Sequence, residues 1–289
     1  MNNHAYTFSI VARDPETGVI CVGGTSQWFA YSTLVPFIEA EVGAIATQAE
    51  CNLSYGTEGL LLLKQGKLPE DIVSILVNND SQKDIRQLLV IDNKGNTAGH
   101  TGKNCVELAN HYLEKDFAIA GNILANETVI PTMKDFYKTS HLPFVLKIIK
   151  TLQKGQEAGG DLRGKRSAGL LIAESKKSGQ YWQGIQYNLR IDDHPEPLQE
   201  IERLYTIATA YQDMNRGDNA YYEEKNKEAA IKYYQKAHKL CPEDPIVKFW
   251  YAKLLWDMQE KEKAQLLLEE LKQTASQWEV YWDRVLATE

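Results

Sequence analysis

The stretch TFSIVARDPETG, residues 7–18, decides how the chain begins to fold. Residues 7–13 are rich in β-branched and aromatic types, which favour a β-strand. The segment DPETG that follows supplies the aspartate, proline and glycine of a turn. Residues 19–25, VICVGGT, form a second apolar run of similar length. The sequence therefore predicts a β-hairpin with Thr7 at the head of its first strand.

Further strands and helices are predicted downstream, and they occur in runs. The predicted strands cover residues 42–49, a hairpin within 85–102, 116–124, 166–175 and 187–193. Helices are predicted between them, at 55–66 ending at Gly66, at 69–80 and, as the second of a pair, at 142–155. Strands gathered in runs with helices between them indicate α+β layers rather than a βαβ alternation. Each sheet is expected to pack one face on helices and the other face on a second sheet.

The character of the sequence changes at the segment HPEP, residues 194–197, and everything after it is helical, charged and aromatic. The two prolines indicate a hinge, which predicts one domain over 1–194 and a helical region over 195–289. Small, aromatic and proline residues recur there at spacings that resemble the 34-residue tetratricopeptide repeat. They are Tyr221, Ala230, Tyr234, Ala237 and Pro242, echoed by Leu255, Ala264, Leu268 and Leu271. Only about two repeats are present, so a neighbouring surface is expected to cover their apolar faces.

Composition excludes several classes of protein. The formal net charge is −7, whereas a nucleic-acid binder needs a basic face. No apolar run is long enough to span a membrane, and the N-terminus lacks the features of a signal peptide. The four cysteines form no CxxC pair, so buried free thiols in a reducing compartment are expected. The sequence therefore predicts a cytoplasmic protein without nucleic-acid or membrane partners.

Several long motifs in the first part of the chain resemble one bacterial and archaeal family. They are TFSIVARDPETG, TSQWFA, ATQAECNLSYGTEGLLLL, AGN at residues 120–122, GGDLRGKRSAGLLI and LRIDDHPEP. The family is catalogued as a domain of unknown function, and its fold is placed among the N-terminal-nucleophile (Ntn) hydrolases. The resemblance covers about two thirds of the chain. It implies a four-layer αββα sandwich and points to an amide-hydrolysing activity.

The same resemblance makes Thr7 a candidate nucleophile. In Ntn hydrolases the threonine is the first residue, and its own α-amine, with a pKa near 8, acts as the base. Here the residues MNNHAY precede Thr7, and an amide nitrogen cannot serve as a base. Catalysis would therefore require cleavage between Tyr6 and Thr7. The alternative is that Thr7 is an ordinary strand residue that packs at the end of a sheet.

Other polar residues stand where strands are expected to end. Asn52 and Asn122 are candidate oxyanion donors, and a helix or loop cap is the alternative for Asn52. Backbone N–H groups and amide side chains are the usual donors to an oxyanion. Ser26 and Gln48 are candidate substrate contacts, and turn polarity is the alternative for Ser26.

The segment GGDLRGKRSAG is rich in glycine and charge. Asp161, Arg163 and Arg166 are candidates to bind an acidic portion of a substrate, and a salt-bridged loop is the alternative. The segment is not a P-loop, because no GxxxxGK[ST] pattern occurs and a strand rather than a helix follows.

Other reactive side chains carry weaker signals. Cys51 lacks a neighbouring histidine in sequence, which disfavours a thiol nucleophile. His100 and His111 have no third ligand at a suitable spacing, so no metal or cofactor is expected. The pair Asp192–Asp193 with His194 is capable of acid–base chemistry, but it lies at the hinge. Aromatic residues of the helical region are interpreted as core, with a peptide groove as the alternative; they are Tyr233, Trp250, Tyr251 and Trp256.

Two functions are compatible with these patterns. The first is hydrolysis of a small amide or peptide-like bond, with Thr7 as nucleophile once residues 1–6 are removed. The second is a catalytically silent domain whose helical repeats bind a protein partner. Homodimerisation is also expected, because a short repeat module gains from being covered.

Overall fold

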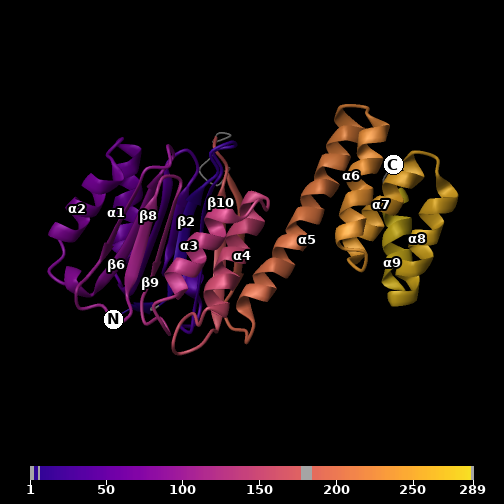
Figure 1. The fold of residues 1–289 in the computed structure, drawn as a ribbon. Coiled ribbons are helices and arrows are strands. Elements are labelled where there is room, and N and C mark those ends of the chain that lie inside the picture. The colour runs from indigo at the N-terminus through magenta and orange to yellow at the C-terminus, as the bar shows by residue number, and fades with distance from the viewer. Residues whose placement is uncertain (1–2, 6, 177–183, 288–289) are drawn as a thin grey trace. The chain divides into compact units, whose positions relative to one another are not determined.

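The predicted hairpin is present as strands β2 (Phe8–Arg13) and β3 (Ile20–Ser26). The structure is a computed structural model that describes residues 3–5, 7–176 and 184–287 (Figure 1). It divides into two compact units, Met1–Glu202 and Arg203–Glu289. The chain therefore contains a mixed α+β unit followed by an all-helical unit, as the sequence predicts.

The hairpin lies in the middle of a 6-stranded antiparallel sheet with the order β11-β10-β3-β2-β9-β8. Its other strands are β8 (Asn110–Glu114), β9 (Phe117–Gly121), β10 (Ser167–Ala173) and β11 (Ile185–Ile191). Strand β2 pairs with β9 so that Phe8 lies opposite Gly121, and with β3 so that Phe8 lies opposite Thr25. The residue before Phe8 is therefore placed where β2 begins and its neighbours β3 and β9 end.

The second sheet is 5-stranded, with the order β1-β5-β6-β7 and with β4 also paired to β5. Its strands are β1 (Asn3–Ala5), β4 (Pro36–Glu39), β5 (Gly43–Cys51), β6 (Arg86–Asp92) and β7 (Thr97–Thr101). One edge of β5 is occupied by β6 and the other is shared by β4 and β1. Asn3–Ala5 thus belong to this sheet, whereas Thr7 leads into the other.

Helices cover the outer face of each sheet, and the inner faces pack on each other (Figure 1). Helices α1 (Leu53–Lys64) and α2 (Pro69–Asn78) pack on the 5-stranded sheet, and α3 (Val129–Thr139) and α4 (Phe144–Glu157) pack on the 6-stranded sheet. An apolar cluster between the sheets joins Val11 and Val22 of one to Ala46 and Leu89 of the other. Because both faces of the central strands are covered, these strands are apolar along nearly their whole length.

The second unit consists of helices joined by short turns. They are the C-terminal part of α5 (Pro197–Asp218), a π-helical turn (Asn219–Glu223), α6 (Lys227–Leu240), α7 (Pro245–Asp257), α8 (Lys261–Thr274) and α9 (Gln277–Leu286). The small residues Ala230 and Ala237 are fully buried beside Tyr234. Trp250, Tyr251 and Trp256 pack against the apolar clusters of this unit. The helical-repeat pattern thus marks core positions.

Some elements differ from the sequence-based predictions. Helix α1 ends at Lys64, and Gly66 follows it with a left-handed φ of 79°. The short strands β1, β4 and β8 are not predicted, because each lies at a sheet edge and lacks a long apolar run. All four cysteines are free, but Cys105 and Cys241 are only half-buried, so the prediction of buried thiols holds only for Cys21 and Cys51.

Candidate functional site

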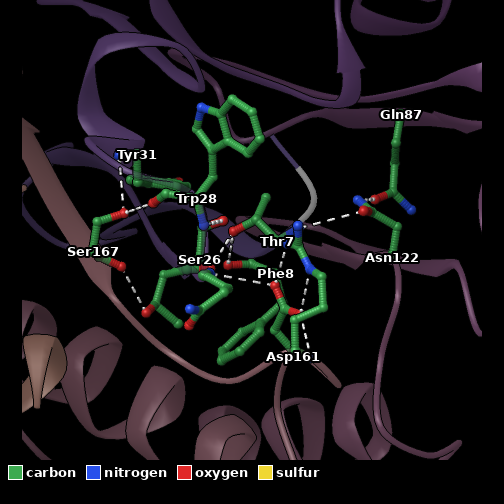
Figure 2. Close-up of polar contacts among 12 residues, drawn as sticks. Thr7, Phe8, Ser26, Trp28, Tyr31, Gln87, Asn122, Asp161 and Ser167 are labelled. Carbon is green, nitrogen blue, oxygen red and sulfur yellow. Dashed lines mark hydrogen bonds and ion pairs between the residues drawn. The ribbon is translucent and has the colours of Figure 1, made fainter. Parts of the chain in front are cut away.

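Thr7 stands immediately before β2 and is fully buried. Its backbone N–H donates to Asn122 Oδ1 at 3.3 Å, and its carbonyl accepts from the Asn122 N–H at 3.0 Å. Its hydroxyl donates to the carbonyl oxygen of Thr25 on β3. Figure 2 shows Thr7 between the ends of these strands, with its nitrogen directed toward Asn122. Both the nitrogen and the hydroxyl of Thr7 are therefore held in defined positions.

Gln87 lies behind Asn122 and connects it to the opposite sheet. Asn122 Nδ2 donates to Gln87 Oε1 at 2.8 Å, and Gln48 Nε2 donates to the same oxygen at 2.6 Å. Ser9 donates through its hydroxyl to Gln48 Oε1 at 2.6 Å. We call Thr7, Ser9, Gln48, Gln87 and Asn122 the buried polar seam; each is 0% exposed. The seam crosses between the two sheets, which also meet through an apolar cluster.

Backbone carbonyls determine the direction of every hydrogen bond in the seam. Gln87 Nε2 donates to the carbonyl oxygens of Gly121 at 2.9 Å and Asn110 at 3.1 Å. A carbonyl can only accept, so the amide of Gln87 has one possible orientation, with Oε1 facing Asn122 and Gln48. Asn122 must then present Nδ2 to Gln87 and Oδ1 to Thr7. The seam thus directs an acceptor, not a donor, at the Thr7 nitrogen.

Tyr31 and His111 close the network at its two ends. Because Ser9 donates to Gln48, the Tyr31 hydroxyl donates to Ser9 Oγ at 3.1 Å. Burial raises the pKa of Tyr31, so this hydroxyl keeps its proton. At the other end, Gln87 Nε2 donates to Thr101 Oγ1 at 2.9 Å, and Thr101 lies 2.8 Å from His111 Nδ1. Burial and the nearby His100 lower the pKa of His111, which favours a neutral ring that accepts from Thr101.

Strained backbone adjoins two residues of the seam and Tyr31, the hydrogen-bond partner of Ser9. Ala30, Ala49 and Ile123 adopt φ values of 55°, 65° and 49°. They are the direct neighbours of Tyr31, Gln48 and Asn122 in sequence. Left-handed conformations cost a residue with a Cβ roughly 1–3 kcal/mol and cluster at functional sites. The fold therefore tolerates strain where it orients these polar side chains.

The glycine-rich loop before β10 brings Asp161 to the same end of the sheet. Leu162 N–H donates to Ile123 O at 2.9 Å, and Arg166 N–H donates to Ser26 O at 2.9 Å. Asp161 is buried, accepts from the Gln27 N–H at 3.4 Å and forms an ion pair with Arg163 at 2.7 Å. Asp161 and Arg163, two of the candidate substrate contacts, are therefore paired with each other beside Ser26 and next to the loop that carries Asn122.

Arg166 and Ser26 occupy different environments. Ser26 is buried, and its hydroxyl accepts from the Trp28 N–H at 2.8 Å. Arg166 is exposed, forms an ion pair with Asp193 at 2.9 Å and lies over the ring of Phe29 at 5.5 Å. This ion pair lowers the pKa of Asp193. Arg166 therefore presents its charge at the surface beside Asp193, whereas the guanidinium of Arg163 is held by the buried Asp161.

Asn52 lies elsewhere, because its side chain is committed to helix α1. It accepts from the Ser54 N–H at 3.1 Å as the N-cap, and its Nδ2 donates to Asp80 at 3.2 Å. The structure therefore places Thr7, Gln48 and Asn122 in one network and leaves Asn52 outside it. Ser9, Tyr31 and Gln87 are members that the sequence reasoning missed. The available signal was a polar residue inside an apolar strand, as in QLLVI at 87–91.

A cavity of about 530 Å³ opens beside the far end of this network. It lies between β8 and the start of α3, and its wall includes Asn110 and His111. Within the described residues, no group of three His, Cys, Asp or Glu side chains is placed to hold a metal ion. No helix among residues 3–5, 7–176 and 184–287 is long and apolar enough to cross a membrane.

Known proteins match the α+β unit and the helical unit separately. Residues 221–287 match the tetratricopeptide repeat, a kind of repeat that suggests protein interaction. No curated protein matches the chain. The crystal structure of protein SPO2555 from Silicibacter pomeroyi, assigned to the DUF1028 family, is similar at 30% identity with a TM-score of 0.64, over 71% of this chain and 90% of that one. Residues 7–201 match the family of unknown function DUF1028, and the chain belongs to that family.

Proposed function

We propose that the first unit is an Ntn-type hydrolase that cleaves a small amide or peptide-like C–N bond after residues 1–6 are removed. The observation that carries this proposal is the setting of Thr7, whose nitrogen faces a carbonyl oxygen of Asn122 at the start of a strand. Two antiparallel sheets covered by helices are compatible with the αββα sandwich that such hydrolases share. The family match also begins at residue 7.

Removal of residues 1–6 begins at Thr7 itself in this proposal. The Thr7 hydroxyl oxygen attacks the carbonyl carbon of Tyr6, and the acyl group moves from the Thr7 nitrogen to its oxygen. The nitrogen takes up a proton and becomes a free amine. Water then hydrolyses the ester, releasing residues 1–6 as a carboxylic acid and restoring the hydroxyl.

Substrate hydrolysis repeats this chemistry with the freed amine as base. The amine takes the proton of the Thr7 hydroxyl while the oxygen attacks the substrate carbonyl. Collapse of the tetrahedral intermediate breaks the C–N bond, and the ammonium returns a proton to the leaving nitrogen. Water, deprotonated by the same amine, hydrolyses the acyl ester. A threonine amine has a reference pKa of about 7.7–8.0, so a large fraction is available as a base near neutral pH.

Asn122 holds the amine in this mechanism rather than the oxyanion. Its Oδ1 faces the Thr7 nitrogen, and its side-chain donor group, Nδ2, donates to Gln87 Oε1. An acceptor at this position orients the amine so that its lone pair can face the hydroxyl. Asn52, which caps α1, is too committed to the helix and to Asp80 to serve as an oxyanion donor.

Arg166 is the group proposed to bind an acidic portion of the substrate. Arg163 is tied to the buried Asp161, whereas Arg166 pairs with Asp193 at the surface. Exposed ion pairs contribute little net free energy, about 0–1 kcal/mol. A substrate carboxylate can therefore replace Asp193 on the Arg166 guanidinium at small cost.

The test is the mass of the purified chain. Wild-type protein is expected to lose residues 1–6 during incubation, and Thr7→Ser is expected to do so as well because it keeps a hydroxyl. Thr7→Val has nearly the same shape without a hydroxyl and is expected to stay full length. The rate of hydrolysis of a panel of N-acyl amino acids and short peptides should rise in proportion to the fraction of chains that have lost residues 1–6. Full-length wild-type protein with no Thr7-dependent hydrolysis would overturn the proposal.

A second candidate is a silent first unit whose partner-binding function lies in the helical repeats. It is favoured by the complete burial of Thr7 in the uncut chain and by the tetratricopeptide match. This candidate predicts that Thr7→Val leaves both the chain length and partner binding unchanged. Isolation of the same interacting protein with wild type and Thr7→Val would support it.

A further inference from the structure

Strand β1 occupies a specific part of the edge of β5. Asn3, His4 and Ala5 lie opposite Cys51, Glu50 and Ala49 in an antiparallel arrangement. The other half of the same edge, Gly43–Ala46, is taken by β4. If residues 1–6 leave, only the Ala49–Cys51 part of this edge loses its partner.

This part of β5 is connected to Thr7 in two ways. Ala5 is two residues from Thr7 in the chain, so the strand that pairs with Ala49 leads directly to the bond proposed to be cut. In addition, Ala49 follows Gln48, whose side chain is part of the buried polar seam. Ala49 has the left-handed φ of 65°, which re-aims the strand at this point. The β5 edge and the candidate nucleophile thus belong to one local structure.

We propose that the β5 edge at Ala49–Cys51 is the binding site for the acyl side of the substrate, and that the substrate is an extended peptide. The peptide adds to β5 as an antiparallel strand in the place of β1, and its last residue before the scissile bond reaches Thr7. This inference rests on the proposed function, because it takes residues 1–6 as the first acyl group that Thr7 releases. It narrows the substrate from any small amide to a peptide.

The physical basis is the backbone of β5. Once β1 has left, the backbone groups that paired with it can pair with an extended peptide whatever the side chains of that peptide are. The carbonyl oxygen of Glu50 is not one of them, because it accepts from Arg86 Nη1 at 2.6 Å. Main-chain pairing would hold the substrate in the register that β1 has on β5. A pairing only three residues long also allows the acyl product to leave.

The experiment measures binding, not turnover. A chain that begins at residue 7 and carries Thr7→Val is titrated with the acetylated, C-terminally amidated peptide of residues 2–6, NNHAY, by calorimetry. The matched control is the intact chain with Thr7→Val, in which β1 remains tethered to the edge. Binding is expected to the shortened chain and to be at least tenfold weaker to the intact chain. Equal binding to both, or none to the shortened chain once circular dichroism shows it folded, would overturn the inference.

Two further measurements keep the test sharp. Successive residues of an edge strand direct their N–H groups alternately toward and away from the neighbour, so N-methylation is expected to abolish binding at alternate positions of the peptide. Uniform tolerance of N-methylation would exclude strand addition. If the shortened chain does not fold, the full-length double variant His4→Pro/Ala5→Pro is used, because one of these two N–H groups faces β5. This variant is expected to bind the peptide, and failure to do so would overturn the inference.

The outcome is separable from the proposed function. In one outcome, the shortened Thr7→Val chain binds the peptide while the shortened wild-type chain hydrolyses nothing. That result would overturn the proposed hydrolase activity and support the peptide site. Hydrolysis of non-peptide amides, together with peptide binding that does not depend on which position is N-methylated, would support the hydrolase and overturn the peptide site. Dimerisation of the shortened chain that excludes the peptide would assign the edge to a second copy and overturn the inference.

Discussion

Gln87 is the residue on which the candidate site depends most. Its two carbonyl partners set the direction of its amide, and that direction passes to Asn122, to Thr7 and to Gln48. A residue that touches neither Thr7 nor any substrate group therefore decides whether the Thr7 nitrogen meets an oxygen or an N–H group. In this sense Gln87 is a positioning residue.

Replacing Gln87 by methionine is expected to destabilise the first unit strongly. The change keeps the volume but leaves Asn122 Nδ2 and Gln48 Nε2 without their shared acceptor and removes the side-chain donor from two backbone carbonyls. Each unsatisfied buried group costs about 1–3 kcal/mol, so we expect a loss of about 3 kcal/mol or more in the free energy of unfolding, measured in urea. The control Gln65→Met is on the surface and should change stability by less than about 0.5 kcal/mol. A Gln87→Met chain as stable as the control would show that the seam carries no such cost.

His111 is expected to make stability depend on pH. Its pKa is lowered in the folded chain from a reference value of 6.5. The contribution of neutral His111 to the free energy of unfolding is complete above the pKa of the unfolded chain. It declines as the pH falls below 6.5, because the unfolded chain then takes up a proton that the folded chain does not. The variant His111→Asn keeps an acceptor for Thr101 but cannot titrate, so its unfolding midpoint should fall less steeply below about pH 6.5.

The control for this measurement is His141→Asn, at an exposed histidine. It should keep the slope of the wild type. The comparison of variants is needed because His238 in the second unit also has a lowered pKa and adds its own dependence on pH. An unchanged slope in His111→Asn would contradict the interpretation.

Part of the candidate site was predictable at the residue scale. Thr7, Gln48 and Asn122 stand at strand ends in the sequence, and the structure joins them. Asn52 occupies an equivalent place in sequence but is drawn to the N–H of Ser54, because a helix begins directly after it. Gln87 and Ser9 lie inside apolar strands, where a single sequence does not reveal which polar partner lies on the opposite sheet.

At the scale of elements, the strands with long apolar runs were predictable and the edge strands were not. The hairpin β2–β3 contains its own turn, so its pairing is local. The pairing of β2 with β9 joins residues more than a hundred positions apart, and no local pattern contains it. Strand β4 begins with a proline, and β1 has only three residues. Such strands take their structure from the edge that they cover.

The packing of α1 on β4 gives a test at this scale. A Cβ added to Gly56 in α1 would fall on the ring of Phe37 in β4. Glycine to alanine in a helix normally gains about 1 kcal/mol, but overpacking costs about 1–3 kcal/mol. Gly56→Ala is therefore expected to lower the unfolding midpoint, whereas Thr57→Ala, at the exposed neighbouring position, should leave it level or raise it. A more stable Gly56→Ala would mean that α1 can move away from Phe37.

At the scale of the whole molecule, the division into an α+β unit and a helical-repeat unit is visible in sequence because two periodicities meet. Alternating and continuous apolar runs give way to small and aromatic residues at helical spacing, with Ala230, Tyr234 and Ala237 in the core of the second unit. Sheet order was not visible, since it depends on which distant strands meet. The compact units divide between Glu202 and Arg203, inside helix α5.

The hydrogen bond from Thr7 to Asn122 spans 115 residues of sequence. At a synthesis rate of about 5–20 residues per second, Asn122 is made roughly 6–23 s after Thr7. Until then the residue that holds the Thr7 nitrogen has not been made, so the proposed cleavage between Tyr6 and Thr7 cannot take place. Loss of the first six residues would then show that a molecule has folded, because the cut follows the formation of this hydrogen bond. In any sample of this protein, the proportion of short chains would count the molecules that have reached the native state at least once.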